Sequence, residues 1–193
     1  MEEKEWTLKE LLRKTRSIRK FQHDKEISTE MLYRLVELTR LCPSGGNKQP
    51  LRFLCVNEKE DCAFISEHIR WAALLKDWGG PTEEEKPSAY ILIAADRSVS
   101  EKAPYDSGIM AHTMIMGAVE EGLAGCMLAN IDREELLMHF GLDKERYNLD
   151  LVVALGVPGE ESVIEPAGES TAYYRDEENL FHVPKRTLPE ILL

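Results

Sequence analysis

The segment TRSIRKF, residues 15–21, combines residue types that bind small anions. Arg16 and Arg19 lie three residues apart, so one helical turn would bring both to the same side, with Ser17 near them. An arginine fork matches two phosphate oxygens, and a serine hydroxyl can donate to a third. Residues 8–21 carry a local excess of five positive charges in a chain of net charge −11. This contrast suits a small-anion site, but charge runs usually lie on the surface, so composition alone favours a solvated basic face on the first helix.

The segment PSGGNKQP, residues 43–50, could contact a flat ligand. Its two glycines allow backbone conformations that other residues avoid, and they let a ligand approach the main chain. Asn47 and Gln49 each offer a donor and an acceptor, which suits the edge of a heterocycle. The alternative is a turn that ends a helix and leads into a strand, which proline and glycine explain without a ligand.

Two further segments could complete such a site. GLAGCMLAN, residues 122–130, is rich in small residues and could present backbone N–H groups to a flat ligand. PKRTLPE, residues 184–190, contains Lys185 and Arg186, which could contribute to an anion site. The alternatives are tight packing between a helix and a strand for the first segment, and a surface basic pair near the terminus for the second.

The sequence contains no recognisable nucleophile–base pattern and neither standard nucleotide cradle, G-x-G-x-x-G or the Walker loop. If the chain is an enzyme, its reactive atom is therefore expected to belong to a cofactor. The four cysteines show no C-x-x-C spacing, so reduced thiols are expected rather than metal ligands.

Composition and charge limit the class of protein. With 193 residues, 43% of them hydrophobic, the chain is expected to form a single domain over residues 1–193. The net negative charge argues against binding to nucleic acid or to an anionic membrane. No apolar run approaches the roughly 18 residues needed to span a bilayer, and the charged N-terminus lacks the pattern of a signal peptide. We therefore expect a cytoplasmic protein.

Apolar spacing and capping residues predict alternating helices and strands, without the regularity of a doubly wound fold. The helix candidate at 106–122 is apolar on nearly all sides, which is typical of a central helix, and Asp106 or Ser107 can cap it. The tail from residue 159 is polar and extended-looking until its apolar end. The helices are expected at 4–15, from Ser28 or Thr29 to Pro43, at 59–76, at 106–122 and at 132–141. The strands are expected at 51–56, 89–96, 124–130 and 149–158, with a mobile loop at 79–87.

In their order, these motifs resemble the FMN-dependent nitroreductase family over residues 14–190. R-S-I-R-x-F precedes P-S-G-G-N-x-Q-P, which is followed by D-S-G-I-x-A-x-x-x-x-x-G-A-x-x-x-G-L-A-G-C, then L-G-x-P and a late K-R. The resemblance implies an α+β fold in which a mixed sheet is flanked by helices. It also implies an intertwined homodimer with two FMN sites at the subunit interface.

The resemblance implies three groups of cofactor-binding residues. The R-S-I-R segment would hold the FMN phosphate and ribityl chain, and the late basic pair would close on the phosphate. The P-S-G-G-N-x-Q segment, usually from the other subunit, would lie along the flavin, and backbone after G-L-A-G-C would approach N5 and O4. The residues are, in that order, Arg16, Ser17 and Arg19 with Lys185 and Arg186; Pro43, Ser44, Gly45, Asn47 and Gln49; and Leu128 and Ala129.

The resemblance further implies an enzyme, an FMN-dependent NAD(P)H oxidoreductase. NAD(P)H would pass hydride to flavin N5, and an organic acceptor such as a nitroaromatic compound or a quinone would follow in a ping-pong cycle. The protein would supply position and charge, so no catalytic residue is predicted. Trp71, Trp78 and the loop 79–87 are candidates for the wall of the substrate pocket.

The chain departs from the family pattern at three places. Thr15 stands where many relatives have a basic residue, Gly45 and Gly46 stand where serine is frequent, and Leu51 replaces a common tryptophan. One alternative to an oxidoreductase is an FMN-binding carrier or sensor without efficient NAD(P)H turnover. Others are a flavin enzyme specialised for one metabolite and a scaffold without a cofactor.

Overall fold

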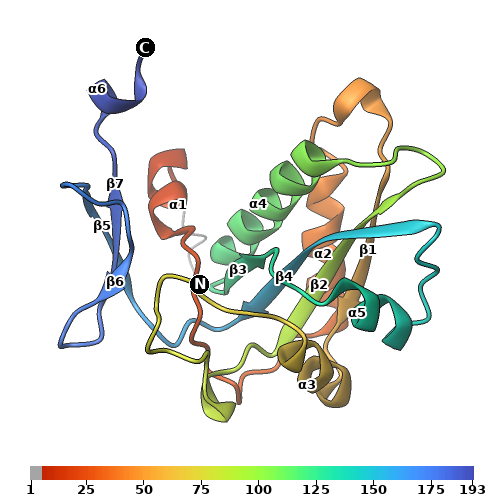
Figure 1. Ribbon diagram of the computed structural model, residues 1–193, viewed down its shortest axis with the longest axis horizontal. Helices are drawn as coiled ribbons and strands as arrows, with labels where there is room; N and C mark the ends of the chain where they lie inside the picture. The colour runs from red at the N-terminus through yellow and green to blue at the C-terminus, as the bar shows by residue number, and fades with distance from the viewer. Residues whose placement is uncertain (1–5) are drawn as a thin grey trace.

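The computed structural model describes residues 6–193, and its strands form two separate sheets. The larger sheet has four antiparallel strands in the order β1 (Leu51–Val56), β2 (Ala89–Asp96), β4 (Tyr147–Gly156) and β3 (Ala124–Leu128). The smaller sheet has the order β5 (Ser162–Pro166), β7 (Phe181–Lys185) and β6 (Tyr174–Arg175). Figure 1 shows the smaller sheet set apart from the larger one, with α1 (Leu8–Lys14) between them. The first two residues of the helix predicted at 4–15 lie outside the described residues.

The helices are α1 Leu8–Lys14, α2 Thr29–Thr39, α3 Lys59–Glu67, α4 Pro104–Glu120, α5 Arg133–His139 and α6 Leu188–Ile191, with 3-10 turns η1 Gly45–Asn47 and η2 Glu83–Glu85. Within residues 6–193, no helix has both the length and the apolar character to cross a bilayer.

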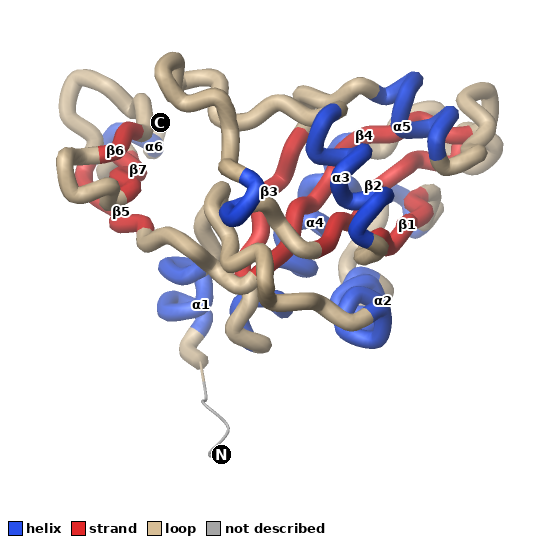
Figure 2. Tube along the Cα trace, turned by 90° about the horizontal axis from the view of Figure 1, so that it is seen from below, coloured by secondary structure: helices blue, strands red, loops and turns tan. Residues whose placement is uncertain are grey.

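Two hydrophobic cores lie on the two faces of the larger sheet. Helices α2 and α4 cover one face, while α3 and α5 cover the other (Figure 2). Strand β2 is buried along its whole length because it lies between two strands and under helices on both sides. Helix α4, the longest, packs on α2 and the sheet through Met110, Ala111, Met114, Ile115 and Ala118.

Several predicted elements are confirmed, and each has a strong local signal. The Ser28 hydroxyl caps α2 by accepting from the Met31 N–H at 3.2 Å. The Asp132 carboxylate caps α5 by accepting from the Glu135 N–H. Strands β1 and β2 have the predicted bounds. Side-chain caps and uninterrupted apolar runs are properties of a few adjacent residues, so they can be read without knowledge of the fold.

The helix predicted at 59–76 is wrong in its second half, because α3 ends at Glu67. Ile69 pairs with Ile131, and the Arg70 N–H donates to the Asn130 carbonyl oxygen at 2.9 Å. The chain after α3 therefore satisfies its backbone beside the segment that follows β3. This tertiary pairing competes successfully with the helical pattern of the sequence.

Helix α4 begins at Pro104, so the prediction that Asp106 or Ser107 caps it is wrong. Its N-cap is Ala103, which makes no side-chain cap, and proline occupies the first turn, where its missing N–H costs nothing. The Asp106 side chain instead contacts the loop 43–50, and the Ser107 hydroxyl donates to Asp150 at 2.7 Å. Both polar groups thus join α4 to other parts of the chain.

The tail after residue 159, expected to be extended, forms the smaller sheet and α6. The buried carboxylate of Glu160 joins this sheet to the N-terminal segment. It accepts from the backbone N–H groups of Arg19 and Lys20 at 2.5 and 3.2 Å, and it pairs with the Arg175 guanidinium at 2.6 Å. These contacts connect residues far apart in the sequence, which is why no local pattern predicts them.

His182 lies between two carboxylates of the smaller sheet. Its Nε2 faces Asp176 at 3.0 Å and its Nδ1 faces Glu165 at 2.9 Å, and these two hydrogen bonds raise the pKa of His182 above its ordinary value. Only the protonated ring can donate to both carboxylates. Because the folded-state pKa is raised, this contribution to stability is fully present below the unfolded pKa, about 6.5, and is lost as pH rises through the folded pKa.

We therefore expect His182→Gln to lower the melting temperature clearly at about pH 6 and much less at about pH 9. Thermal unfolding of both proteins at the two pH values measures the difference. Asp176→Asn, which removes one of the two carboxylates, should reproduce the same pH dependence. An equal loss at both pH values would contradict the ion-paired description of His182.

Candidate functional site

Strand β3 is an edge strand whose outer side is bridged only at its two ends. Ser17 pairs with Gly125 at one end, and Ile69 pairs with Ile131 beyond the other. Between these bridges, no described backbone segment pairs with the outer edge of residues 126–129. Four extended residues span about 13 Å, which is enough for a flat ring system to lie along the strand.

Of the residues predicted here, Leu128 ends β3 and pairs with Val152 of β4, and Ala129 follows the strand. Leu128 is buried and Ala129 is exposed, and the Arg133 guanidinium donates to the Ala129 carbonyl oxygen at 3.1 Å. Burial raises the pKa of the Cys126 thiol to about 11, so this thiol is neutral at physiological pH. A Cβ at Gly125 would lie 3.0 Å from the Ala154 carbonyl oxygen, so the small residue here also serves tight packing.

A basic cavity of about 520 Å³ lies between α1 and the smaller sheet. Arg16 and Lys185, which come from opposite ends of the sequence and were both predicted to bind the phosphate, line this cavity. Arg186 is exposed and does not line it. The Arg16 Nη2 donates to the Leu12 carbonyl oxygen at 3.0 Å, but its Nε is buried without a partner. Burial also lowers the pKa of Arg16. The cationic lining residues are Lys9, Arg13, Arg16 and Lys185, and none of the lining residues within 6–193 is acidic.

Arg19 does not line this basic cavity. Helix α1 ends at Lys14, so the residues after it are extended, and Arg16 and Arg19 do not share a helical face. The Arg19 side chain is 9% exposed, and its guanidinium lies over the rings of Tyr173 and Phe181, 4.7 and 5.0 Å from their centroids. Its Nη1 donates to the Ser17 carbonyl oxygen at 3.0 Å. Arg19 therefore connects the N-terminal segment to the smaller sheet.

The loop 43–50 is a tight turn with exposed amide side chains. Asn47 and Gln49 have left-handed φ values of 53° and 49°, and both side chains are exposed. The Gln49 Nε2 donates to the Asn47 Oδ1 at 3.1 Å. Pro43 and Gly45 are exposed as well. The predicted residues of this loop thus form one compact, accessible group.

This loop and the basic segment lie at opposite ends of α4. The loop contacts Asp106 in the first turn, whereas Arg16 shares a second cavity with Val119, one residue before the end of the helix. The thirteen residues between these positions correspond to about 20 Å of helix. A single chain therefore presents two separate groups of predicted site residues.

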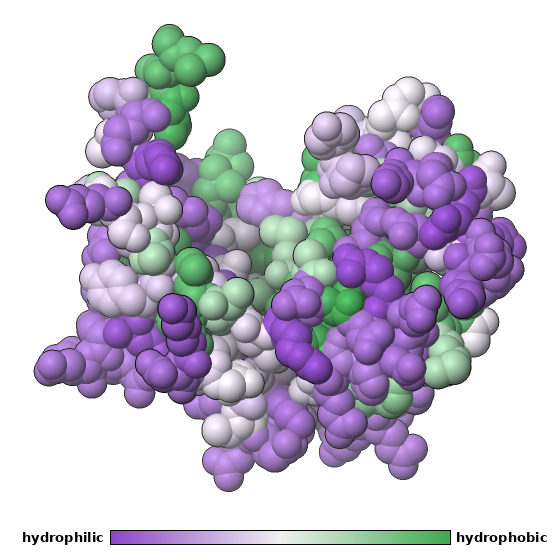
Figure 3. All heavy atoms as spheres, in the orientation of Figure 1, coloured by the Kyte–Doolittle hydropathy of each residue, from purple (hydrophilic) through white to green (hydrophobic). Residues whose placement is uncertain are grey.

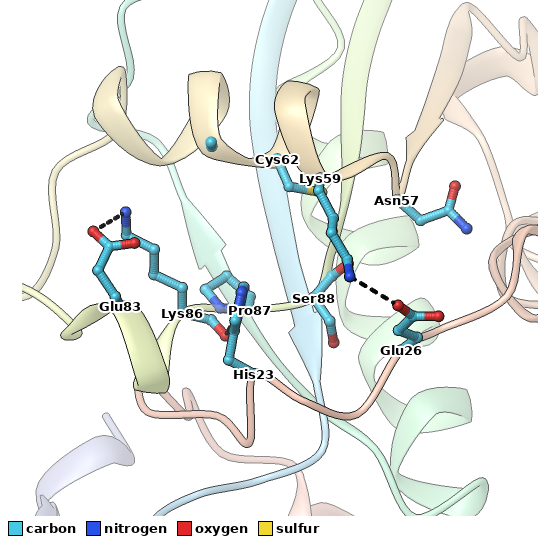
Figure 4. Close-up of a pocket in the computed structure, with 10 residues that line it drawn as sticks. His23, Glu26, Asn57, Lys59, Cys62, Glu83, Lys86, Pro87 and Ser88 are labelled. Atoms are coloured by element: carbon cyan, nitrogen blue, oxygen red, sulfur yellow. Dashed lines mark hydrogen bonds and ion pairs between the residues drawn. The ribbon is translucent and has the colours of Figure 1, made fainter.

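A smaller cavity of about 120 Å³ lies between the start of α3 and the segment before β2 (Figure 4). None of the predicted cofactor-binding residues lines it, but Glu83, Lys86 and Pro87 of the loop predicted as a pocket wall do. Its two lysines are each paired with a glutamate, Lys59 with Glu26 at 3.3 Å and Lys86 with Glu83 at 2.7 Å. Burial raises the pKa of the Cys62 thiol on its wall to about 12. The basic cavity beside α1 is thus the better anion site.

Two residues of the site region were missed by the sequence analysis. Asp106 was assigned to helix capping, since an aspartate near a helix start has that role by default. Glu160, which holds the backbone at Arg19 and Lys20, follows a predicted strand with no pattern around it. The only signal in the sequence is the excess of positive charge in the N-terminal segment, which a carboxylate from a distant part of the chain could balance.

The model of the nitroreductase family matches residues 12–157. The chain belongs to the nitroreductase family. This is a family of FMN-dependent oxidoreductases, so the predicted family, enzyme class and cofactor are confirmed. The matched region ends before Glu160 and the smaller sheet.

Two curated relatives match over most of their length. A protein of Archaeoglobus fulgidus, provisionally named an NADH dehydrogenase/NAD(P)H nitroreductase, is 27% identical over 180 residues, which cover 91% of this chain and 90% of the relative. YdgI of Bacillus subtilis, provisionally named an NAD(P)H nitroreductase, is 25% identical over 185 residues, covering 79% of this chain and 88% of the relative.

Solved structures share the fold. A protein from Desulfovibrio desulfuricans crystallised with FMN has a TM-score of 0.70 at 24% identity, and the match covers 98% of this chain and 97% of that one. Another FMN complex, from Exiguobacterium sibiricum, has a TM-score of 0.68 at 18% identity and covers 81% and 90%. The predicted nitroreductase-like α+β fold is thereby confirmed.

Proposed function

We propose that this oxidoreductase binds FMN with the phosphate in the basic cavity and the ring system along the open edge of β3. Bound there, FMN supplies a centre that accepts hydride from NAD(P)H and returns it to an organic acceptor, such as a nitroaromatic compound or a quinone, in a ping-pong cycle. The observation that carries the proposal is the buried Arg16 Nε, which has no hydrogen-bond partner among the residues that the structure describes. A phosphate oxygen would give it an acceptor.

The phosphate end fits a dianion. Arg16 and Lys185 provide donors from two directions, and Lys9 and Arg13 add positive charge with no acidic lining residue to oppose them. Arg186 follows Lys185 and is assigned a lesser role because it does not line the cavity. Ser17 lies where the cavity region meets β3, so its hydroxyl is assigned to the phosphate or the ribityl chain.

Arg19 is assigned an indirect role in the same site. Its guanidinium is held between aromatic rings and the Ser17 carbonyl oxygen, so it fixes the course of the segment that carries Arg16 and Ser17. Cation–π contacts are stronger when they are desolvated, as they are here. Glu160 supports the same segment from its backbone side.

Main-chain groups of the protein are assigned to the contacts with the flavin ring system. The open edge of β3 offers main-chain groups at Leu128 and Ala129, which suit the polar edge of the isoalloxazine. Because the flavin contains the reactive atom, the chain contributes position and charge rather than an acid or base. Trp78, which lies beneath the Arg175 guanidinium at 5.2 Å, is assigned to the pocket wall.

We further propose a homodimer in which the loop 43–50 of one subunit completes the site of the other. Since about 20 Å of α4 separates the two groups within one chain, a second subunit must supply Pro43, Ser44, Gly45, Asn47 and Gln49. Two α4 helices packed antiparallel about a two-fold axis would bring each loop to the partner's basic segment. This arrangement yields two equivalent sites per dimer.

The surface of α4 supports such a dimer. Between Tyr105 and Met116, the side of the helix that is not buried has no charged residue, and Tyr105 and Ile109 are clearly exposed. A long uncharged stripe is typical of a surface that another protein covers. The C-terminal end also projects as a hydrophobic segment (Figure 3), with exposed Ile191 and Leu192. A second copy of the chain would cover both surfaces.

The phosphate assignment predicts a loss of affinity. Arg16→Ala should weaken FMN binding by about 1.5–3 kcal/mol, the range for a hydrogen bond to a charged group. This corresponds to about tenfold to 150-fold in the dissociation constant. Titration of FMN fluorescence with FMN-free protein measures it. Lys185→Ala should behave similarly, and Lys25→Ala, outside the cavity, should bind FMN normally; normal binding by Arg16→Ala would refute the assignment.

The dimer proposal predicts different outcomes for two exposed apolar residues. Ile109→Asp places a charge on the uncharged stripe of α4 and should shift the protein to monomers that have lost FMN. Met138→Asp, on the exposed side of α5, should leave both the dimer and the FMN content intact. Sedimentation analysis with absorbance at the flavin wavelength measures both properties. A dimeric, FMN-loaded Ile109→Asp protein would exclude α4 from the interface.

The proposed activity is tested by anaerobic absorption spectra of the FMN-reconstituted protein after addition of NADH and then NADPH. Bleaching of the oxidised flavin bands by either nucleotide, followed by recovery with a nitroaromatic compound or a quinone, is the expected result. Flavin bands that persist with both nucleotides would instead favour an FMN carrier or sensor.

A further inference from the structure

One carboxylate holds the loop 43–50 against α4. Asp106 is 7% exposed, and both of its oxygens accept hydrogen bonds from the loop. The Ser44 hydroxyl donates to Oδ2 at 2.5 Å, and the Gly45 N–H donates to Oδ1 at 3.1 Å. Because the acceptors belong to a buried side chain on the most buried helix, the start of the loop is fixed relative to the hydrophobic core.

The same carboxylate acts on the far end of the loop through Ser44. While its hydroxyl donates to Asp106, the Ser44 Oγ accepts from the Gln49 N–H at 3.0 Å. The turn is therefore closed by a chain of hydrogen bonds from Asp106 through Ser44 to Gln49. Hydrogen bonds to a charged acceptor are the stronger kind, and this one polarises the serine hydroxyl.

The loop needs such an anchor because its backbone is strained. Asn47 and Gln49 both occupy the left-handed region, which costs free energy for residues other than glycine and persists only where surrounding contacts impose it. Gly46, which precedes Asn47, also has a left-handed φ of 57°. Besides the hydrogen bonds within the turn, this conformation is held by the contacts of Asp106 and Ser44 and by Arg52, whose Nη1 donates to the Gln49 carbonyl oxygen at 3.1 Å.

The position of Asp106 in α4 suits a negative charge. It lies in the first turn, where the helix dipole and the free N–H groups favour an anion. A helix cap would use one oxygen for its own helix, yet α4 begins without a side-chain cap and Asp106 uses both oxygens for the loop. The residue is thus committed to the loop rather than to the helix that contains it.

We propose that Asp106 is a positioning residue of the FMN site, which holds the loop so that the Asn47 and Gln49 amides face the flavin bound in the partner subunit. This proposal rests on the proposed function, because the loop is assigned to the flavin there. Asp106 itself does not touch the cofactor. It sets the loop in the binding conformation before FMN arrives, which reduces the entropy lost on binding.

The test compares three variants of the full-length chain with the natural protein. Asp106→Ala removes both contacts. Asp106→Asn keeps an oxygen for the Gly45 N–H and an amide that can donate to the Ser44 Oγ. Ser28→Ala is the control, because it removes a side-chain hydrogen bond at the other end of the helix that leads to the loop. The readouts are the FMN dissociation constant, the melting temperature and the hydrogen-exchange rates of the Gly45 and Gln49 amides without FMN.

Asp106→Ala should raise the FMN dissociation constant at least tenfold and accelerate exchange at both amides, while Asp106→Asn should stay within about threefold of the natural protein. Ser28→Ala should lower the melting temperature without changing either loop readout. Unchanged FMN affinity and unchanged exchange in Asp106→Ala would overturn the proposal. Equal weakening by Ser28→Ala would also overturn it, because the effect would then be general destabilisation.

The test distinguishes failure of the proposed function from failure of the positioning role of Asp106. If the natural protein binds no FMN, the proposed function fails, and exchange at Gly45 and Gln49 alone decides whether Asp106 holds the loop. If the natural protein binds FMN and Asp106→Ala binds it equally well, only the positioning role of Asp106 fails.

Discussion

Helix α4 is the rigid element on which the arrangement of the site depends. One side of it is buried against α2 and the larger sheet, so its position cannot change without disrupting that core. Its 17 residues span about 25 Å. The loop 43–50 is held at its first turn, and the basic segment lies near its last. The length of one helix therefore keeps the two halves of the proposed site apart in each chain, which is the basis of the proposed dimer.

The basic cavity beside α1 contrasts with the net negative charge of the chain. The chain has a net charge of −11, yet the cavity beside α1 is lined by cations without an acidic residue. Burying the Arg16 Nε without a partner costs free energy that a bound anion would recover. The buried carboxylates of Glu160 and Asp106 do not line this cavity. Glu160 accepts hydrogen bonds from backbone N–H groups and pairs with Arg175, and Asp106 accepts hydrogen bonds from the loop.

Much of the fold could be predicted because its signals are local. The Ser28 cap and the apolar run of β2 are properties of adjacent residues. The errors arise where distant parts of the chain decide the structure. Helix α3 stops early because the backbone at Ile69 and Arg70 pairs beside the end of β3. The smaller sheet depends on the buried Glu160, which has no partner nearby in the sequence.

The site shows the same difference between local signals, which could be predicted, and contacts between distant residues, which could not. Two residues that the motifs singled out, Arg16 and Lys185, line one cavity although they are far apart in the sequence. Spacing alone placed Arg16 and Arg19 on one side, but that inference assumes a helix, and α1 ends at Lys14. The role of Asp106 depends on the tertiary position of a loop, so a capping role is the best that local reasoning can offer.

The central claim, that each FMN site combines the basic segment of one subunit with the loop of the other, is tested most directly by subunit complementation. Chains with Arg16→Ala and chains with Gly45→Glu are co-expressed with different affinity tags, and the mixed dimers are isolated and titrated with FMN. If the site is shared, one site of each mixed dimer contains both substitutions and the other contains neither. We therefore predict one site of natural affinity per mixed dimer, although neither parent dimer has any. Mixed dimers with no such site would contradict the account.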